Sequence, residues 1–193
     1  MPSVSKIPKN VNKYVTKCAF KIKNEALEHG KGVSFFNGKI SGESKIFIGT
    51  EYGVSFDNVN NPNDIFIHNH PSGAVLSNSD LFAAVSTDVK KVFASTPSGF
   101  TAMDLTTVKK SISKKEMLDC IRNEKEELGK FAKTLLEPYI KQFITIEKIP
   151  KEIYDNLNNK FGIILNDKIK EFAKMTGATF SDVKWSDYKQ LNK

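Results

Sequence analysis

Cysteine and arginine are scarce in this sequence, and long apolar runs are missing from it. The two cysteines among 193 residues, Cys18 and Cys120, have no C-x-x-C spacing, so we expect reduced, buried thiols, with one disulfide as the alternative. No apolar run approaches the roughly 18 residues that a membrane-spanning helix needs, and the N-terminus lacks the apolar stretch of a secretory signal. We therefore expect a cytoplasmic protein without a membrane segment, and this leaves open its delivery into a host or partner cell.

The positive charge is neither concentrated nor carried by arginine. Arg122 is the single arginine among 29 basic residues, and the net charge is +7. Residues 1–112 carry 13 basic and 9 acidic groups, and residues 113–193 carry 16 and 13. Proteins that read nucleic acids usually gather their charge on one face and use arginine for bidentate contacts. We therefore expect no specific nucleic-acid partner.

Two of the three histidines stand two residues apart, in the stretch His68-Asn69-His70-Pro71-Ser72-Gly73. The preceding residues 64–67 are apolar and partly β-branched after Asp64, which predicts a strand that Pro71 ends. Side chains alternate along a strand, so both imidazoles point to one face, and Asn69 points to the other, where a structural role is expected. Two imidazoles with Asp80, ten residues further on, can form a three-ligand zinc site with one open position.

The pattern Ser77-x-x-Asp80 also has a simpler interpretation. Serine followed three residues later by an acidic residue resembles a capping box, which only starts a helix. Residues 81–85 are the apolar first turns of that expected helix. Ser77 is then its N-cap, and Asp80 projects from its first turn, close to the end of the histidine strand.

The remainder of the chain predicts a mixed α/β fold that changes character at about residue 110. We expect helices over residues 11–28 and 80–89, and strands over 32–36, 45–48, 53–56, 65–70, 91–94 and 100–105, with a hairpin turn at Asn37-Gly38. Residues 1–110 form the first domain, and 111–193 a mostly helical region that packs against it or recognises a substrate or partner. In that region Pro138 and Pro150 should kink or end helices, residues 153–164 and 169–175 should be helical up to Gly177, and Trp185 should anchor the end of the chain.

Taken together, His68-x-His70-Pro71 and Ser77-x-x-Asp80 resemble the JAMM signature of the JAB/MPN metalloproteases, in the form found in the prokaryotic and phage-associated branch. The resemblance is strong over residues 64–82, diffuse from about 20 to 108, and absent from the last eighty or so residues. It implies a JAB/MPN-like, cytidine-deaminase-like mixed sheet flanked by helices. It also implies a Zn²⁺ cofactor held by His68, His70 and Asp80.

The resemblance further implies a catalytic glutamate upstream of the histidines. Glu25, Glu28, Glu43 and Glu51 are the candidates; we choose Glu28, with Glu25 second, because Glu28-His29-Gly30 is followed by a strand and a turn, as in related sequences. In such a site Glu28 takes a proton from the zinc-activated water and passes it to the leaving amine. Ser77 stabilises the oxyanion, which typically contributes a few kcal/mol.

The expected function is therefore zinc-dependent hydrolysis of a peptide or isopeptide bond, in a bacterial or phage effector or processing enzyme. The partner is a protein or peptide substrate; a ubiquitin-like tail, a host protein and a peptide cross-link are all compatible. The alternative is a JAB-fold binding or assembly module without catalytic activity. An HNH nuclease is rejected, because its motif residues are spread over a ββα unit and no histidine follows His70.

Overall fold

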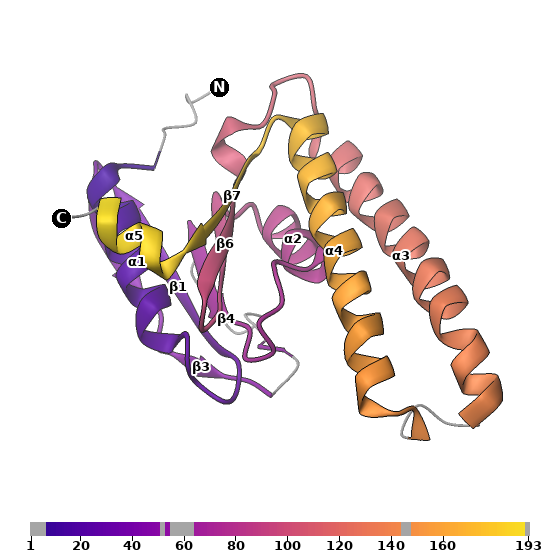
Figure 1. Cartoon of the computed structure of the whole chain (residues 1–193). Helices are drawn as coiled ribbons and strands as arrows, with labels where there is room; N and C mark the ends of the chain where they lie inside the picture. The colour runs from indigo at the N-terminus through magenta and orange to yellow at the C-terminus, as the bar shows by residue number, and fades with distance from the viewer. Residues whose placement is uncertain (1–6, 51–52, 55–63, 144–147, 192–193) are drawn as a thin grey trace.

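The computed structural model describes residues 7–50, 53–54, 64–143 and 148–191 (Figure 1). Within these residues seven strands form one mixed sheet in the order β2-β1-β4-β5-β6-β7, and β3 pairs with β1. The strands are β1 (His29–Phe36), β2 (Lys39–Glu43), β3 (Phe47–Ile48), β4 (Ile65–Asn69), β5 (Lys91–Ser95), β6 (Gly99–Asp104) and β7 (Thr179–Lys184). Among the strands that the structure describes, β4 and β5 form the one parallel pair. The predicted mixed α/β class is confirmed.

Helices cover both faces of this sheet. The helices α1 (Lys9–Ile22) and α5 (Trp185–Leu191) lie on one face, and α2 (Asn78–Ser86), α3 (Lys114–Phe143) and α4 (Lys151–Thr176) lie on the other (Figure 1). Trp185 is buried on the α1 face, and its Nε1 donates a hydrogen bond to Thr96 O (2.8 Å), so the anchor predicted for this residue is confirmed. None of the helices described here has the length and apolar character needed to cross a membrane.

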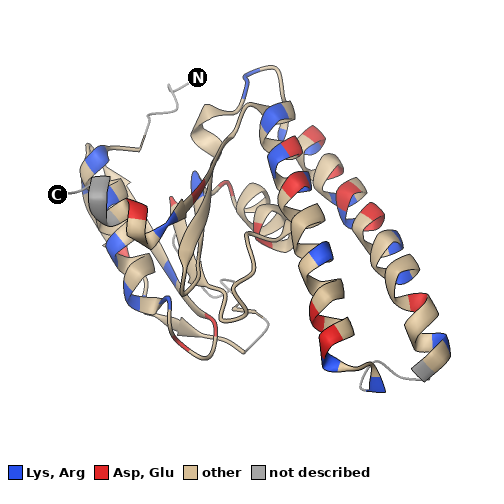
Figure 2. Ribbon diagram, viewed as in Figure 1, with Lys and Arg blue, Asp and Glu red and all other residues tan. Residues whose placement is uncertain are grey.

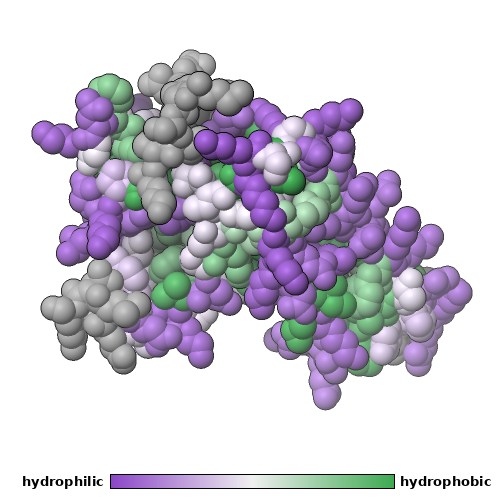
Figure 3. Space-filling view, turned by 90° about the horizontal axis from the view of Figure 1, so that it is seen from above, coloured by the Kyte–Doolittle hydropathy of each residue, from purple (hydrophilic) through white to green (hydrophobic). Residues whose placement is uncertain are grey.

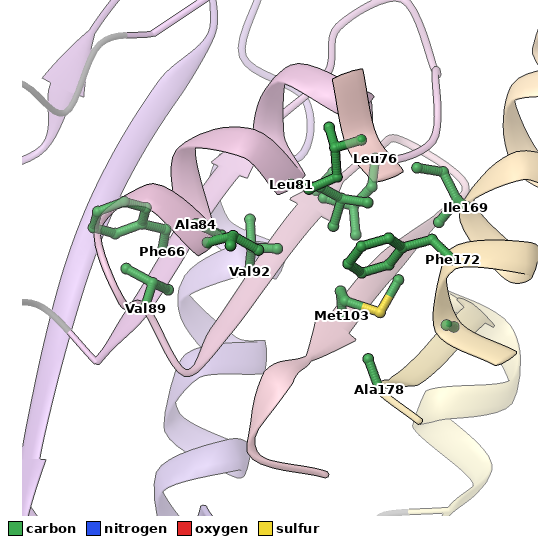
Figure 4. Packing of buried hydrophobic residues seen from close by; sticks show 14 residues of the cluster. Phe66, Leu76, Leu81, Ala84, Val89, Val92, Met103, Ile169, Phe172 and Ala178 are labelled. Atoms are coloured by element: carbon green, nitrogen blue, oxygen red, sulfur yellow. The ribbon is translucent and has the colours of Figure 1, made fainter. Parts of the chain in front are cut away.

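The central strand β4 divides the core in two. Ile65 and Ile67 pack on the α1 side, whereas Phe66 packs with α2, α4 and β5 on the other side, because strand side chains alternate. Figure 4 shows this second cluster, in which Phe172 from α4 lies beside Leu81 from α2. All five residues of β4 are buried. The strand therefore sets which side chains reach the space beneath α2.

Residues after 110 complete both the sheet and the core. β7 pairs with β6 over six residues, and an added Cβ at Gly99 would lie 2.4 Å from Val183 O, so the two strands approach closely. The sequence analysis missed β7 because Phe180 and Val183 are three residues apart, a spacing typical of one helix face. In the strand they point to opposite faces, with Phe180 packed on the α2 side and Val183 on the α1 side.

Several other local predictions can be compared with the structure. The turn at Asn37-Gly38 is confirmed, with φ angles of 48° and 76° that suit a two-residue hairpin. The predicted helix 11–28 ends earlier, at Ile22, and residues 53–56 lie partly outside the described residues. Residues 153–164 and 169–175 belong to one continuous helix, α4, which Gly177 ends with a φ of 80°.

Pro138 does not end a helix, because α3 continues to Phe143. Of the two effects expected of Pro138, a kink or an end of the helix, the structure excludes the end. Pro138 is exposed and stands near the end of α3, where water can satisfy the carbonyl that loses its amide donor. Pro150, in contrast, precedes the first residue of α4 as its N-cap.

Charged residues of both signs are interspersed along α3 and α4, as Figure 2 shows. Seen from above, the molecule has a largely hydrophilic surface with smaller hydrophobic areas between the hydrophilic residues (Figure 3). One acidic residue of α3 departs from this surface pattern: Glu124 is 8% exposed, its Oε2 has no hydrogen-bond partner among the described residues, and Cys120 Sγ donates to its Oε1 (3.7 Å). Burial raises the pKa of Glu124 to about 7.

The raised pKa of Glu124 makes stability depend on pH. The native state binds a proton that the unfolded chain releases, so this residue adds stability as pH falls from about 7 toward 4.5 and removes it above pH 7. We expect Glu124→Gln to stabilise the protein at pH 8 by about 1–2 kcal/mol, after allowance for solvent screening, and to have little effect at pH 5. Urea unfolding at both pH values measures this. Exposed Glu126→Gln is the control, and an equal effect of Glu124→Gln at both pH values would contradict the prediction.

Candidate metal centre

The two histidines of the motif lie on the α2 side of the sheet. His68 is in β4, and His70 N donates to Ser95 O (2.7 Å), which extends the pairing with β5 by one residue beyond the strand. His70 therefore stays in register with His68, and their ring centroids are 4.7 Å apart. A turn closed by Gly73 N to His70 O (3.0 Å) then leads the chain away from the sheet and toward α2.

The donor atoms of His68, His70 and Asp80 converge. The Nε2 atoms of the two histidines are 3.0 Å apart, His68 Nε2 is 3.2 Å from Asp80 Oδ1, and His70 Nε2 is 3.6 Å from Asp80 Oδ2. One ligand atom from each of the three residues lies within 4.8 Å of the others. Both histidines are buried, at 2% and 7% exposed. The three predicted ligands are therefore brought together in a buried group that can hold a metal ion.

Ser77 and Asp80 form the capping box of α2 as well. Asp80 N donates to Ser77 Oγ (3.2 Å), and Ser77 N donates to Asp80 Oδ2 (2.7 Å), so the simpler interpretation of this pattern is confirmed. The two interpretations are compatible because a carboxylate has two oxygens. Oδ2 closes the helix cap, while Oδ1 faces His68. The cap thus fixes the direction of the carboxylate toward the histidines.

Glu28 is the only one of the four candidate glutamates that the described residues place at the histidines. It is buried, and its Oε1 is 3.9 Å from His70 Nε2. Glu25 is exposed, Glu43 contacts Tyr14 and Lys31, and Glu51 lies outside the described residues. Burial raises the pKa of Glu28 above its ordinary value, partly offset by His68.

The backbone of Glu28 is held from two directions. Glu28 N donates to Thr50 O and Gly49 N donates to Glu28 O, both at 2.8 Å. Gly49 suits this position because a Cβ would lie 2.1 Å from Gly53 O. Asn69, on the face of β4 opposite the histidines as expected, contacts the same segment through its side chain.

Asn69 ties the segment of Glu28 to the histidine strand. Its Oδ1 accepts from His29 N (2.5 Å), and its Nδ2 donates to the carbonyls of Glu25 and Leu27 (both 3.1 Å). The side chain is fully buried. The sequence predicted a structural role for Asn69 but did not show that its side chain holds the backbone of residues 25–29. The H-x-H spacing alone contains no signal that the middle residue fixes the glutamate segment.

Charge in the cluster is distributed unequally. Burial would lower the pKa of His68, but the nearby Asp80 and Glu28 carboxylates raise it above its ordinary value. Burial and the neighbouring His68 lower the pKa of His70. For Asp80, burial opposes ionisation, but the two histidines outweigh it and lower the pKa well below its usual range. The cluster therefore combines a carboxylate held in its ionised form with two imidazoles whose pKa values are shifted in opposite directions.

A divalent ion fits this donor set. Ligand atoms bound tetrahedrally to zinc at about 2.0–2.1 Å lie about 3.3 Å from one another, and the shortest distances here are 3.0 and 3.2 Å. Binding through Nε2 leaves Nδ1 as a donor, and His70 Nδ1 lies 3.0 Å from Ala74 O. The Nδ1 atom of His68 is buried and has no such partner among the described residues.

The cluster opens into a cavity of about 410 Å³, within the range of ligand-binding pockets. Its walls include Glu28, Ser77, Val75 and Val54, and also Leu165 from α4. Leu165 comes from the region to which the motif resemblance does not extend. Sequence reasoning did not identify it, because Leu165 belongs to an ordinary apolar helix pattern.

The hydrogen bonds of Asn69 can be tested by Asn69→Leu. This change removes three part-buried hydrogen bonds and takes the Asn69 partner from the His29 amide and the Glu25 carbonyl, while Leu27 O keeps its contact with His29 Nδ1 (3.0 Å), so we expect a loss of about 1–3 kcal/mol in the free energy of unfolding. Urea unfolding and hydrogen exchange at the His29 amide measure it. Asn10→Leu removes a surface hydrogen bond to Gly38 O and is the control. Unchanged exchange at His29 would contradict the role assigned to Asn69.

Comparisons with known proteins add no family to these observations. A scan against protein-family models gives no match, and searches of curated proteins and of solved structures give none either. What the chain can do is therefore inferred from the side chains of the cavity, their distances and the motif that carries them.

Proposed function

We propose that the protein is a zinc-dependent peptidase or isopeptidase of the JAMM type, built on a JAB/MPN-like fold. One observation carries the proposal: a buried His-His-Asp donor set and a buried glutamate line the same cavity. A metal site with a purely structural role usually has four protein ligands, whereas three ligands leave one position for water or substrate. The position of the H-x-H pair at the end of a central strand, with helices on both faces of the sheet, agrees with the proposed fold.

His68, His70 and Asp80 would hold the ion. A bound zinc ion would supply Lewis-acid polarisation of a substrate carbonyl and would lower the pKa of a water molecule beside it. Glu28 accepts the proton of the attacking water and delivers it to the leaving amine. Because burial shifts the pKa of Glu28 upward, toward neutral pH, this carboxyl group is better suited both to accept the proton and to release it.

Ser77 contributes through its hydroxyl group. In the structure Ser77 Oγ donates to Asp80 Oδ2 (2.8 Å), so the hydroxyl must turn away from Asp80 before it can donate to a substrate. Once turned, it stabilises the negative charge that develops on the substrate carbonyl oxygen. The backbone amide of Ser77 keeps its bond to Asp80 meanwhile, so the ligand remains oriented.

Metal content tests the donor set. We expect about one zinc per chain in the protein purified without a histidine tag, and none in the double variant His68→Ala/His70→Ala, because one carboxylate cannot retain the ion alone. Elemental analysis measures this. His29→Ala removes the third histidine, which lies outside the cluster, and should keep its zinc. Equal zinc in all three proteins would place the ion elsewhere and overturn the proposal.

The role of Glu28 is tested by Glu28→Gln. We expect this variant to keep its zinc and to lose turnover of fluorogenic peptide and isopeptide substrates by about 10²–10⁴-fold, since it lacks the proton acceptor. Glu25→Gln, at an exposed position, should keep both properties. If Glu28→Gln retained full activity, another carboxylate would be the base. A zinc-loaded wild type without any turnover would favour the binding-module alternative.

A further inference from the structure

The cavity at the metal centre has a charged end and an apolar end. Among its described wall residues, the carboxylate and imidazole side chains are those of Glu28, His68, His70 and Asp80, which lie together at the donor cluster. No other wall residue that the structure describes carries a charge. Outside the cluster the polar side chains are serine hydroxyls, and the apolar walls are Val54, Phe66, Ala74, Val75, Ala83, Val92 and Leu165.

The floor of the apolar end adjoins the metal ligands. Phe66 and His68 stand two residues apart on β4, so their side chains leave the same face of the sheet, about 6.6 Å apart along the strand. Val92 is the partner of Phe66 on β5. Both side chains are buried and pack with α2 (Figure 4). A substrate held at the metal centre therefore has apolar surface within reach of one side chain.

Two helices form the sides of the apolar end. Ala83 follows Asp80 by three residues, which places both on one side of α2, and Ala83 is exposed, so it lies nearer the mouth than the buried Phe66. Leu165, from α4, is half-buried and packs against the same cluster as Phe66. A methyl group on one helix and a leucine on another thus limit the width of this space. We call its wall residues the apolar subsite: Phe66, Val75, Ala83, Val92 and Leu165.

An uncharged side chain is the occupant that these walls favour. A carboxylate or ammonium group placed here would lose its water without gaining an ion-pair partner from the described walls, and this is unfavourable. Glycine would leave the apolar surface unfilled. The cavity volume of about 410 Å³ admits an extended segment of chain but not the face of a second folded copy.

We propose that the apolar subsite receives the side chain of one of the two residues that flank the bond to be cleaved, and that this side chain is apolar. Resting on the proposed function, this assignment narrows the substrate class to peptides or proteins with an apolar residue at the scissile bond. A tail that presents only glycine at this bond would be a poor substrate, because it gains nothing from the apolar walls.

Two sets of internally quenched fluorogenic peptides are the probe. Each set varies one residue, before or after the scissile bond, among glycine, alanine, leucine, phenylalanine, aspartate and lysine. For zinc-loaded wild type we expect, in one of the two sets, kcat/KM for leucine to exceed that for aspartate and lysine by about 100-fold, and that for glycine by about tenfold. Fluorescence anisotropy should give the same ranking of dissociation constants for Glu28→Gln, with and without zinc, because binding does not require turnover.

Opposite changes in the size of the subsite test the named residues. Leu165→Ala widens it and should shift the preference from leucine toward phenylalanine by about tenfold, whereas Ala83→Leu narrows it and should shift the preference toward alanine to a similar extent. Ala83 is exposed, so its replacement leaves the core intact. The matched control is Ile163→Ala on the same helix as Leu165. Ile163 is 64% exposed and outside the cavity walls, so this change should leave the ranking unaltered.

The remaining outcomes separate the subsite from the proposed function. Cleavage with equal kcat/KM for apolar, charged and glycine peptides supports a peptidase but overturns the apolar subsite. A wild-type ranking retained by both Leu165→Ala and Ala83→Leu also overturns it. Binding to Glu28→Gln that follows the apolar ranking, combined with no cleavage by zinc-loaded wild type, overturns the proposed function and leaves the subsite as part of a binding pocket. Neither binding nor cleavage of any peptide overturns both.

Discussion

Burial of charge beneath α2 is the constraint on which the rest of the structure depends. Two imidazoles and two carboxylates are taken out of water within a few ångströms of one another, which is favourable only if their charges and hydrogen bonds are balanced. Asp80 meets this demand by dividing its oxygens between the helix cap and His68. His70 directs its second nitrogen to Ala74 O. A divalent ion would bind the remaining donor atoms and offset the negative charge of the carboxylates.

The scaffold supplies this balance with very few residues. Because β4 is central and alternates, consecutive residues of one strand serve opposite sides of the sheet: His68 reaches the cavity, while Asn69 reaches the backbone that carries Glu28. His68 and the segment of Glu28 are thus tied to the same strand, while the cap of α2 positions Asp80. Such an arrangement fixes the distance between Glu28 and the histidines, as the proposed proton transfer would require.

The motif, the α2 cap, the hairpin at Asn37-Gly38 and the mixed α/β class could be read from the sequence because each depends on a few neighbouring residues. β7 could not be predicted, because Phe180 and Val183 point to opposite faces of the sheet and their spacing of three residues is typical of a helix. The sequence named Glu28 among four glutamates, but only the tertiary arrangement separates it from exposed Glu25. The sequence could not identify Leu165 as a residue of the cavity wall, because only the packing of α4 with α2 brings it there. The metalloprotease resemblance itself remains a prediction.

The late position of β7 has a consequence for the order in which the protein is made. Until residues 179–184 leave the ribosome, β6 has an unpaired edge, and the apolar face later covered by α4 is open. Nascent chains with such edges are prone to aggregation and to engagement by chaperones. The wall of the cavity formed by Leu165 is also missing at that stage. The cavity wall and the sheet edge are therefore completed together, only after α4 and β7 have been made.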